Sequence, residues 1–174
     1  CYIHHLAGDG IVMRADQNDL GLPKTWRIER CLLVSNGGYG IHLESPNNSE
    51  LAYNVVMDGL DVELNAAGGI YAGAELSKIP NSIFAYNGVD PTSRGGIHIQ
   101  GVPGYTAYEN LIAGNGFEGN QPYDVYADRV ANLTIRSNDF SRLLVFGVAL
   151  PDNFIRLDGS NGADDVRIEN NQFS

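Results

Sequence analysis

Seven short stretches of this chain can be superimposed on one another, and this repetition limits what the chain can fold into. Each stretch starts with an asparagine or a cysteine, at Cys1, Cys31, Asn54, Asn81, Asn110, Asn138 and Asn171. An apolar residue follows two positions later, at Ile3, Leu33, Val56, Ile83, Ile112, Phe140 and Phe173. Because the intervals vary from 23 to 33 residues, one structural unit recurs with loops of different length.

A second register repeats a glycine followed by an apolar residue. It contains Gly10-Ile11, Gly40-Ile41, Gly69-Ile70 and Gly96-Ile97, and Val125 and Ile155 continue it without the glycine. Polar and apolar residues then alternate, as in Ile97-His98-Ile99-Gln100. This period of two predicts half-buried strands, so each unit of roughly 28 residues holds at least two strands.

These repeats predict an all-β parallel β-helix, a β-solenoid of about six coils, formed by residues 1–174 as a single domain. Asn-Gly turns at Asn36-Gly37, Asn87-Gly88 and Asn115-Gly116 suit its bends. Stacked coils lie about 4.8 Å apart, so inward asparagines can hydrogen-bond through their amides in a ladder. We expect Asn81, Asn110 and Asn138 to be vertical neighbours in that ladder.

Three segments carry a resemblance to a known family: residues 27–31, 36–43 and 166–173. They resemble the pectin-lyase-like superfamily of right-handed parallel β-helices, along the whole chain. That superfamily includes polysaccharide lyases, glycoside hydrolases, epimerases, phage tailspikes and adhesins, so the resemblance implies the fold more strongly than an activity. The signatures of polygalacturonases, pectate lyases and alginate epimerases are absent, and no catalytic residue is carried over from them.

The net charge of the chain limits the kinds of partner that it can bind. The net charge of −10 argues against nucleic acid and against anionic membranes, whose phosphates attract basic surfaces. The chain begins and ends in the middle of a repeat, which predicts a fragment of a longer helix with further domains in the same polypeptide. A homotrimer, as in tailspikes, is a further expectation.

Cys1 and Cys31 are expected in one column on adjacent coils. We interpret them as two reduced thiols that fill ladder positions; a disulfide stays the alternative. No cofactor is predicted. Calcium is considered only at Asp58, Asp61 and Glu63, which we interpret as solvated carboxylates of a loop between two strands.

The outward positions of the glycine-apolar strand are the first place to look for a site. One outward column contains Val12, His42, Tyr71, His98, Tyr126 and Arg156, and the next contains Arg14, Glu44, Gly73, Gln100, Asp128 and Asp158. Aromatic faces can stack on sugar rings while polar tips bind hydroxyl groups. The alternative is cross-strand pairing that only stabilises the sheet.

Asp128 and Asp158 are the catalytic candidates, because equivalent positions on consecutive coils bring their carboxyl groups within about 5 Å. Two carboxylates at that distance can act as an acid and a base. Arg156 lies beside them, and Glu44 and Gln100 could contact the substrate. The alternatives are that both Asp residues start turns or bind a divalent cation.

The sequence therefore predicts a polysaccharide-recognising β-helix, extracellular, on a cell surface or part of a virion. His42, Tyr71, His98, Tyr126, Arg156, Glu44 and Gln100 are the predicted binding residues. A carbohydrate-active enzyme, either a glycoside hydrolase or a polysaccharide lyase, and a stalk without a ligand are the two alternatives.

Overall fold

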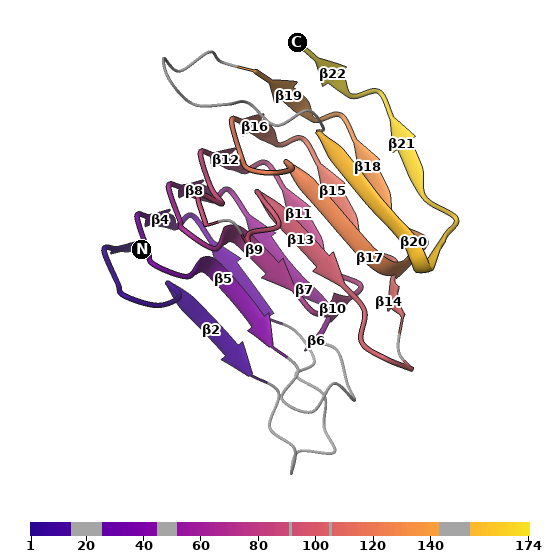
Figure 1. Ribbon diagram of the computed structural model, residues 1–174, viewed down its shortest axis with the longest axis horizontal. Coiled ribbons are helices and arrows are strands. Elements are labelled where there is room, and N and C mark those ends of the chain that lie inside the picture. The colour runs from indigo at the N-terminus through magenta and orange to yellow at the C-terminus, as the bar shows by residue number, and fades with distance from the viewer. Residues whose placement is uncertain (15–25, 45–51, 91, 105, 143–153) are drawn as a thin grey trace.

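The computed structural model describes residues 1–14, 26–44, 52–90, 92–104, 106–142 and 154–174. These residues form short strands that stack in successive coils, with every strand pair parallel (Figure 1). Within the described ranges, no helix is long and apolar enough to span a membrane. Strand stacking of this kind buries one face of each strand inside the coil.

The strands form three long sheets and one short pair. The first sheet contains β1 (Tyr2–His4), β4 (Leu32–Val34), β8 (Asp61–Glu63), β12 (Ile83–Ala85), β16 (Gly116–Glu118), β19 (Asp139–Ser141) and β22 (Gln172–Phe173). The second contains β3 (Trp26–Glu29), β7 (Val55–Asp58), β11 (Lys78–Pro80), β15 (Leu111–Ala113), β18 (Thr134–Arg136) and β21 (Arg167–Glu169). The third contains β2 (Ile11–Arg14), β5 (Tyr39–Glu44), β9 (Gly68–Ala72), β13 (Ile97–Gln100), β14 (Ala107–Tyr108), β17 (Val125–Ala131) and β20 (Ile155–Asp164). The short pair is β6 (Ala52–Tyr53) with β10 (Ala74–Glu75).

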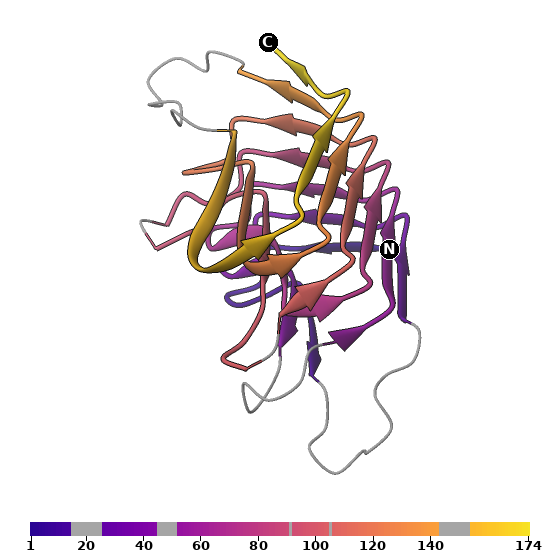
Figure 2. The same ribbon diagram turned by 90° about the vertical axis from the view of Figure 1, so that its right-hand side faces the viewer.

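Each coil runs through the second, the first and then the third sheet, as the side view in Figure 2 shows. The prediction of an all-β parallel β-helix is confirmed, with three long sheets around one core. The interior is apolar and repetitive. Phe84, Phe117, Phe140 and Phe173 stack in one column, with ring centroids 5.2, 4.8 and 5.1 Å apart. Identical side chains on successive coils therefore fill the same layer of the core.

Sharp corners separate the sheets, and each corner uses the same local conformation. A residue with positive φ turns the chain, and the next residue points into the core, as with Tyr86 (φ 55°) followed by Asn87. At the corner before the third sheet, Asn36, Asn65, Asn87 and Asn120 stack as an amide ladder. Asn87 Oδ1 accepts from Asn65 Nδ2 at 2.9 Å, and Asn87 Nδ2 donates to Asn120 Oδ1 at 2.9 Å and to the Val62 carbonyl at 2.7 Å. Buried amides in this arrangement are fully hydrogen-bonded.

The specific ladder expected from the sequence was wrong. Asn81, Asn110 and Asn138 are not vertical neighbours. Asn81 and Asn138 occupy different positions of one corner, and Asn110 belongs to another corner. Asn138 stacks between Asn115 and Asn171, in a second ladder that Ser82 extends. Asn81 is the exposed turning residue before Ser82, with φ 53°.

Asn110 belongs to the third corner, where its Oδ1 accepts a hydrogen bond from the Ser77 backbone N–H at 3.0 Å. Three corners per coil repeat nearly the same motif, so an alignment on asparagine combined different corners. The prediction of one apolar column is wrong for the same reason at Val56, Ile83 and Ile112. The residues stacked between Leu33 and Phe140 are Val62, Phe84 and Phe117.

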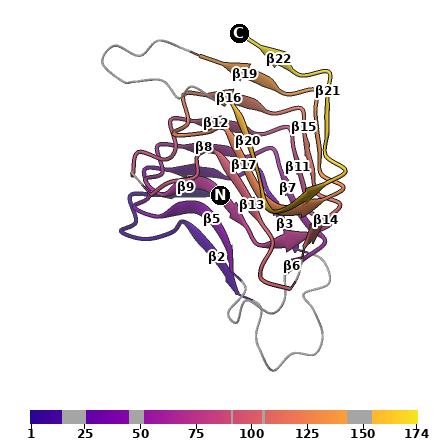
Figure 3. The same cartoon turned by 45° about the vertical axis from the view of Figure 1, so that its right-hand side comes forward.

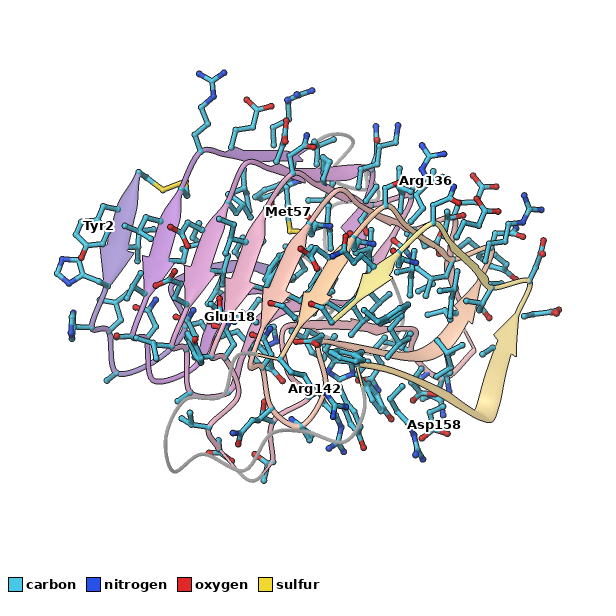
Figure 4. All side chains as sticks on the ribbon, turned by 90° about the horizontal axis from the view of Figure 1, so that it is seen from above. Tyr2, Met57, Glu118, Arg136, Arg142 and Asp158 are labelled. Atoms are coloured by element: carbon cyan, nitrogen blue, oxygen red, sulfur yellow. A yellow bond between two sulfur atoms is a disulfide. The ribbon has the colours of Figure 1, made fainter. Side chains whose placement is uncertain are left out.

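Cys1 and Cys31 do share a column, as the pairing of Tyr2 with Leu32 shows, but they form a disulfide. The interpretation as two reduced thiols was therefore wrong. The bond is visible beside Tyr2 in Figure 4, and it covalently links β1 to the next coil. It lies at the corner where later coils carry Ser82 and Asn115.

Replacing Asn87 by Ala should lower the free energy of unfolding by about 3 kcal/mol, because several buried donors and acceptors lose their partner. The matched control is Asn81→Gly, which accepts positive φ and removes only an exposed bond to Asp58. Urea denaturation followed by circular dichroism measures both. Equal losses in the two variants would contradict the buried ladder.

Candidate functional site

The register of the third sheet follows the sequence prediction. Ile41, Ile70, Ile97, Val125 and Ile155 pair in order along its inner face. His42 pairs with Val12 and Tyr71, His98 pairs with Tyr71 and Tyr126, and Arg156 pairs with Tyr126. The expected outward column is therefore one continuous row across this sheet, whose stacked strands Figure 3 shows.

Six rings make a chain of direct contacts on this face, and we call it the aromatic ladder. Its members are Tyr39, His42, Tyr71, His98, Tyr126 and Tyr123. The three central contacts all have centroid distances of 4.9 Å with interplanar angles of 73–89°. Edge-to-face geometry of this kind is the favourable one for aromatic pairs. Tyr39 and Tyr123 close the two ends, at 5.4 Å from His42 and 5.7 Å from Tyr126.

The polar tips of the ladder meet other side chains. His42 Nδ1 lies 2.9 Å from Asp9 Oδ2. Tyr71 donates its hydroxyl proton to Gln100 Oε1 at 3.3 Å, and Tyr126 donates to Asp158 Oδ2 at 3.1 Å. The rings of the ladder therefore form an aromatic surface, and hydrogen-bonding groups lie along its border.

His98 differs from the other members. It is only 5% exposed, and neither ring nitrogen has a hydrogen-bond partner among the described residues. Burial, together with the nearby Arg94 charge, lowers the pKa of His98 to about 3. The ring is therefore neutral at physiological pH.

Arg94 places a cation on the ladder. Its guanidinium carbon lies 5.2 Å from the centroid of Tyr126. The preceding turn is fixed, because the buried Ser93 hydroxyl donates to the Gln121 carbonyl at 3.0 Å and accepts from the Gly95 N–H at 3.0 Å. A Cβ at Gly95 would lie 1.6 Å from the Tyr123 carbonyl oxygen, so this segment requires glycine.

Asp128 and Asp158 pair directly across β17 and β20. Asp128 is 7% exposed and Asp158 is half-buried. Burial, the hydrogen bond to Asp158 and the charges of both carboxylates raise the pKa of Tyr126. Neither residue is at the end of its strand; β17 bends at Arg129 (φ 52°) and continues to Ala131. The structure thus brings together a tyrosine and two carboxyl groups, and their catalytic role stays a prediction.

The other predicted residues occupy the expected positions. Gln100 pairs with Asp128 across β13 and β17, and Arg156 is exposed on β20. Figure 4 shows Asp158 at the outer side of this sheet. Glu44 ends β5 in the expected register with Arg14, and its side chain lies outside the described set.

Sequence reasoning missed Tyr39, Tyr123 and Arg94. Strict alternation from His42 places residue 39 inside, but Gly40 and Ile41 both face the core. A Cβ at Gly40 would meet Val62 at 2.7 Å, so glycine lets the strand approach the core before it turns outward. The shared spacing Tyr39-x-x-His42 and Tyr123-x-x-Tyr126 was the signal that could have revealed the two ends.

Asp124 was also missed, although the sequence marks it as a break in the glycine series. It occupies the inward place that Gly40, Gly69 and Gly96 hold on earlier coils. Asp124 is 2% exposed and accepts a 2.8 Å hydrogen bond from Asn120 Nδ2, at the end of the amide ladder. Burial raises the pKa of this carboxyl to about 7, against the opposing effect of the Asn120 bonds.

Two other polar groups lie away from the ladder. The acidic residues considered for calcium lie on strands: Asp58 ends β7, and Asp61 and Glu63 belong to β8. Among the described residues, no three His, Cys, Asp or Glu side chains are arranged to hold a metal ion. An open polar pocket of about 250 Å³, between the second and third sheets, is lined by Glu109, Asn132, Thr134, Asp165 and Arg167.

The comparisons agree with this architecture. A family model described as a right handed beta helix region matches residues 1–174, so the chain belongs to that family. No curated protein sequence is similar enough to count as a match.

A solved structure with a similar fold is the A-module of the mannuronan C-5 epimerase AlgE4 from Azotobacter vinelandii. The TM-score is 0.59 at 16% sequence identity, with 99% of this chain and 54% of that chain covered. The chain thus spans about half the length of this relative, and the likeness shows the fold alone. Together with the family match, it confirms the resemblance to the pectin-lyase-like superfamily.

The raised pKa of Asp124 predicts a pH-dependent loss of stability. The folded state keeps the proton up to about pH 7, whereas an unfolded Asp releases it near pH 3.8, so stability falls as pH rises between these values. Asp124→Asn keeps an acceptor for Asn120 and cannot ionise. It should match the wild type near pH 4 and exceed its unfolding free energy by about 2 to 4 kcal/mol at pH 8.

Urea denaturation at pH 4, 6 and 8 measures this difference, with the exposed Asp139→Asn as the control variant. A constant difference between Asp124→Asn and the wild type across this range would show that the carboxyl is not protonated in the fold.

Proposed function

We propose that this β-helix binds a polysaccharide along the outer face of its third sheet. The observation that carries the proposal is the aromatic ladder, which crosses successive strands in unbroken contact. A ladder that only stabilised the sheet would need neither hydroxyl and carboxyl groups along its edge nor a cation over one ring. Tyr126, Asp158 and Arg94 supply these groups in one place.

Sugar polymers suit this arrangement physically. The less polar faces of sugar rings stack on aromatic side chains, and their hydroxyl groups pair with amides and carboxylates. The four central rings, His42, Tyr71, His98 and Tyr126, stand on four successive coils, so a linear chain can repeat the same contact on several coils. The similar fold of a mannuronan C-5 epimerase is consistent with a polysaccharide ligand.

A carbohydrate-active enzyme is the second candidate. Asp128 and Asp158 are neighbours in register, and the Tyr126 hydroxyl is bonded to one of them. Such a cluster can supply an acid and a base on one side of a bound sugar. Replacing both Asp residues by Asn should abolish turnover and preserve binding if they are catalytic. Turnover that survives the double substitution would remove them from the mechanism.

We also infer an extracellular, cell-surface or virion location, because a disulfide between Cys1 and Cys31 persists in oxidising surroundings. The homotrimer stays a prediction, and a particle mass near three times 18.8 kDa would support it.

The binding test uses immobilised mannuronan, polygalacturonan, chondroitin sulfate and a neutral xylan. The wild type should retain at least one of them, and Tyr71→Ala and Tyr126→Ala should each weaken retention about tenfold, equivalent to about 1.4 kcal/mol. The control is Tyr108→Ala, which removes a tyrosine that is 47% exposed and outside the ladder.

Affinity electrophoresis or isothermal titration calorimetry gives the dissociation constants. A wild-type chain that retains none of a wide polysaccharide panel would overturn the proposal and favour the stalk. Equal retention by the two ladder variants and the wild type would move the binding site elsewhere.

A further inference from the structure

The two ring nitrogens of His98 lack partners in the described part of the chain, although the residue belongs to an outward-facing row. Tyr71 and Tyr126 flank the ring on the neighbouring strands, each with its centroid 4.9 Å away. A buried imidazole without any hydrogen bond is unfavourable, so its retention calls for a physical reason. A ligand that reaches this ring would provide the missing partner.

Arg94 occupies the space beside His98. Tyr39 and Tyr123 lie in one row across the coils, and the two positions between them are Gly68 and Gly95. No side chain therefore fills the space between these two tyrosines. The charge of Arg94 affects the pKa of Tyr39, His98 and Tyr126, so its guanidinium lies within electrostatic reach of all three rings.

The guanidinium has no strong partner in this position. Within the ranges that the structure describes, no carboxylate lies within salt-bridge distance of Arg94. Its contacts are the face of Tyr126 and a long hydrogen bond of 3.4 Å to the Ser93 carbonyl. The side chain is exposed, so it can leave the ring without disturbing the buried turn that carries it.

We infer that Arg94 selects the ligand: a sugar unit with an oxyanion substituent, a carboxylate or a sulfate ester, draws the guanidinium off Tyr126, stacks there and reaches His98. The inference rests on the proposed polysaccharide binding and specifies its substrate class. Arg94 is a specificity-determining residue in this account, and the ring beneath it is a covered subsite.

The exchange favours acidic sugars for an electrostatic reason. A guanidinium pairs with an oxyanion through two parallel hydrogen bonds, which are stronger than its stacking on an exposed ring. An acidic sugar unit that displaces Arg94 from Tyr126 gives the guanidinium an ion pair in place of the lost stacking contact. A neutral sugar breaks the same stacking contact and forms no ion pair with Arg94. The neutral imidazole of His98 adds a donor or an acceptor and no competing charge.

The experiment compares polymers that differ in their oxyanion groups: mannuronan against its carboxyl-reduced product, and dextran sulfate against neutral dextran. The wild type should bind at least one charged polymer about tenfold more tightly than its uncharged counterpart. Arg94→Ala should reduce that ratio to about one and bind the neutral polymers somewhat more tightly, because the face of Tyr126 is then open. Arg136→Ala, an exposed arginine on the second sheet, is the matched control and should keep the wild-type ratio.

A second variant tests the contact between the ligand and His98. His98→Phe keeps a ring between Tyr71 and Tyr126 but lacks both nitrogens, and it should bind the preferred charged polymer several-fold more weakly. In the wild type, the imidazole ¹⁵N resonances of His98 should shift on titration with that polymer. The pair of polymers that shows the tenfold preference identifies whether Arg94 recognises a carboxylate or a sulfate ester.

The possible results are distinguishable. If the wild type binds none of these polymers, the selection by Arg94 is wrong, and the proposed function fails with it when the wider polysaccharide panel is not bound either. If the wild type binds them but Arg94→Ala and Arg136→Ala keep the same ratio, the polysaccharide function stands and the selection by Arg94 is wrong. Unchanged affinity of His98→Phe, with unshifted ¹⁵N resonances, would exclude His98 from the contact.

Discussion

Buried asparagine amides join successive coils at their corners, and the rest of the structure depends on these hydrogen bonds. At a corner the chain leaves the regular strand pairing, so backbone groups in the core would lose their partners. Asn115 shows the solution: its Nδ2 donates to the Ile79 carbonyl and to Asn138 Oδ1. The corner becomes part of the stack, and the strands on both sides keep their register.

The binding face inherits its geometry from this register. The spacing of the aromatic ladder is set by the strands, since its four central rings stand on successive coils and adjacent coils are held together at both ends of the strand. Tight turning into the third sheet depends on Gly40 and Gly96, where a side chain would strike the core. At Asp124 the same position holds a carboxyl, and the amide ladder ends there with an acid in place of a further amide.

The sequence was sufficient for the fold and for the third sheet. The glycine-apolar series fixed the order from Ile11 to Ile155, and the outward row from His42 to Arg156 followed from alternation. It was insufficient for the corners, because three corners carry one motif and only the three-dimensional fold distinguishes Asn110 from Asn115. It also missed Tyr39 and Tyr123, since two consecutive inward residues break the period of two. Arg94 reaches the site from a loop, and no periodic pattern describes a loop residue.

Each of the four central rings of the ladder belongs to a separate coil, and each coil forms its own hydrogen bonds with its neighbours. A duplication of one whole coil, about 28 residues, would lengthen the face by a single row and leave the contacts on either side intact. Deletion of a coil would shorten it in the same way. The reach of such a surface along a polymer can thus change during evolution in whole-coil increments, without redesign of the residues that already touch the chain.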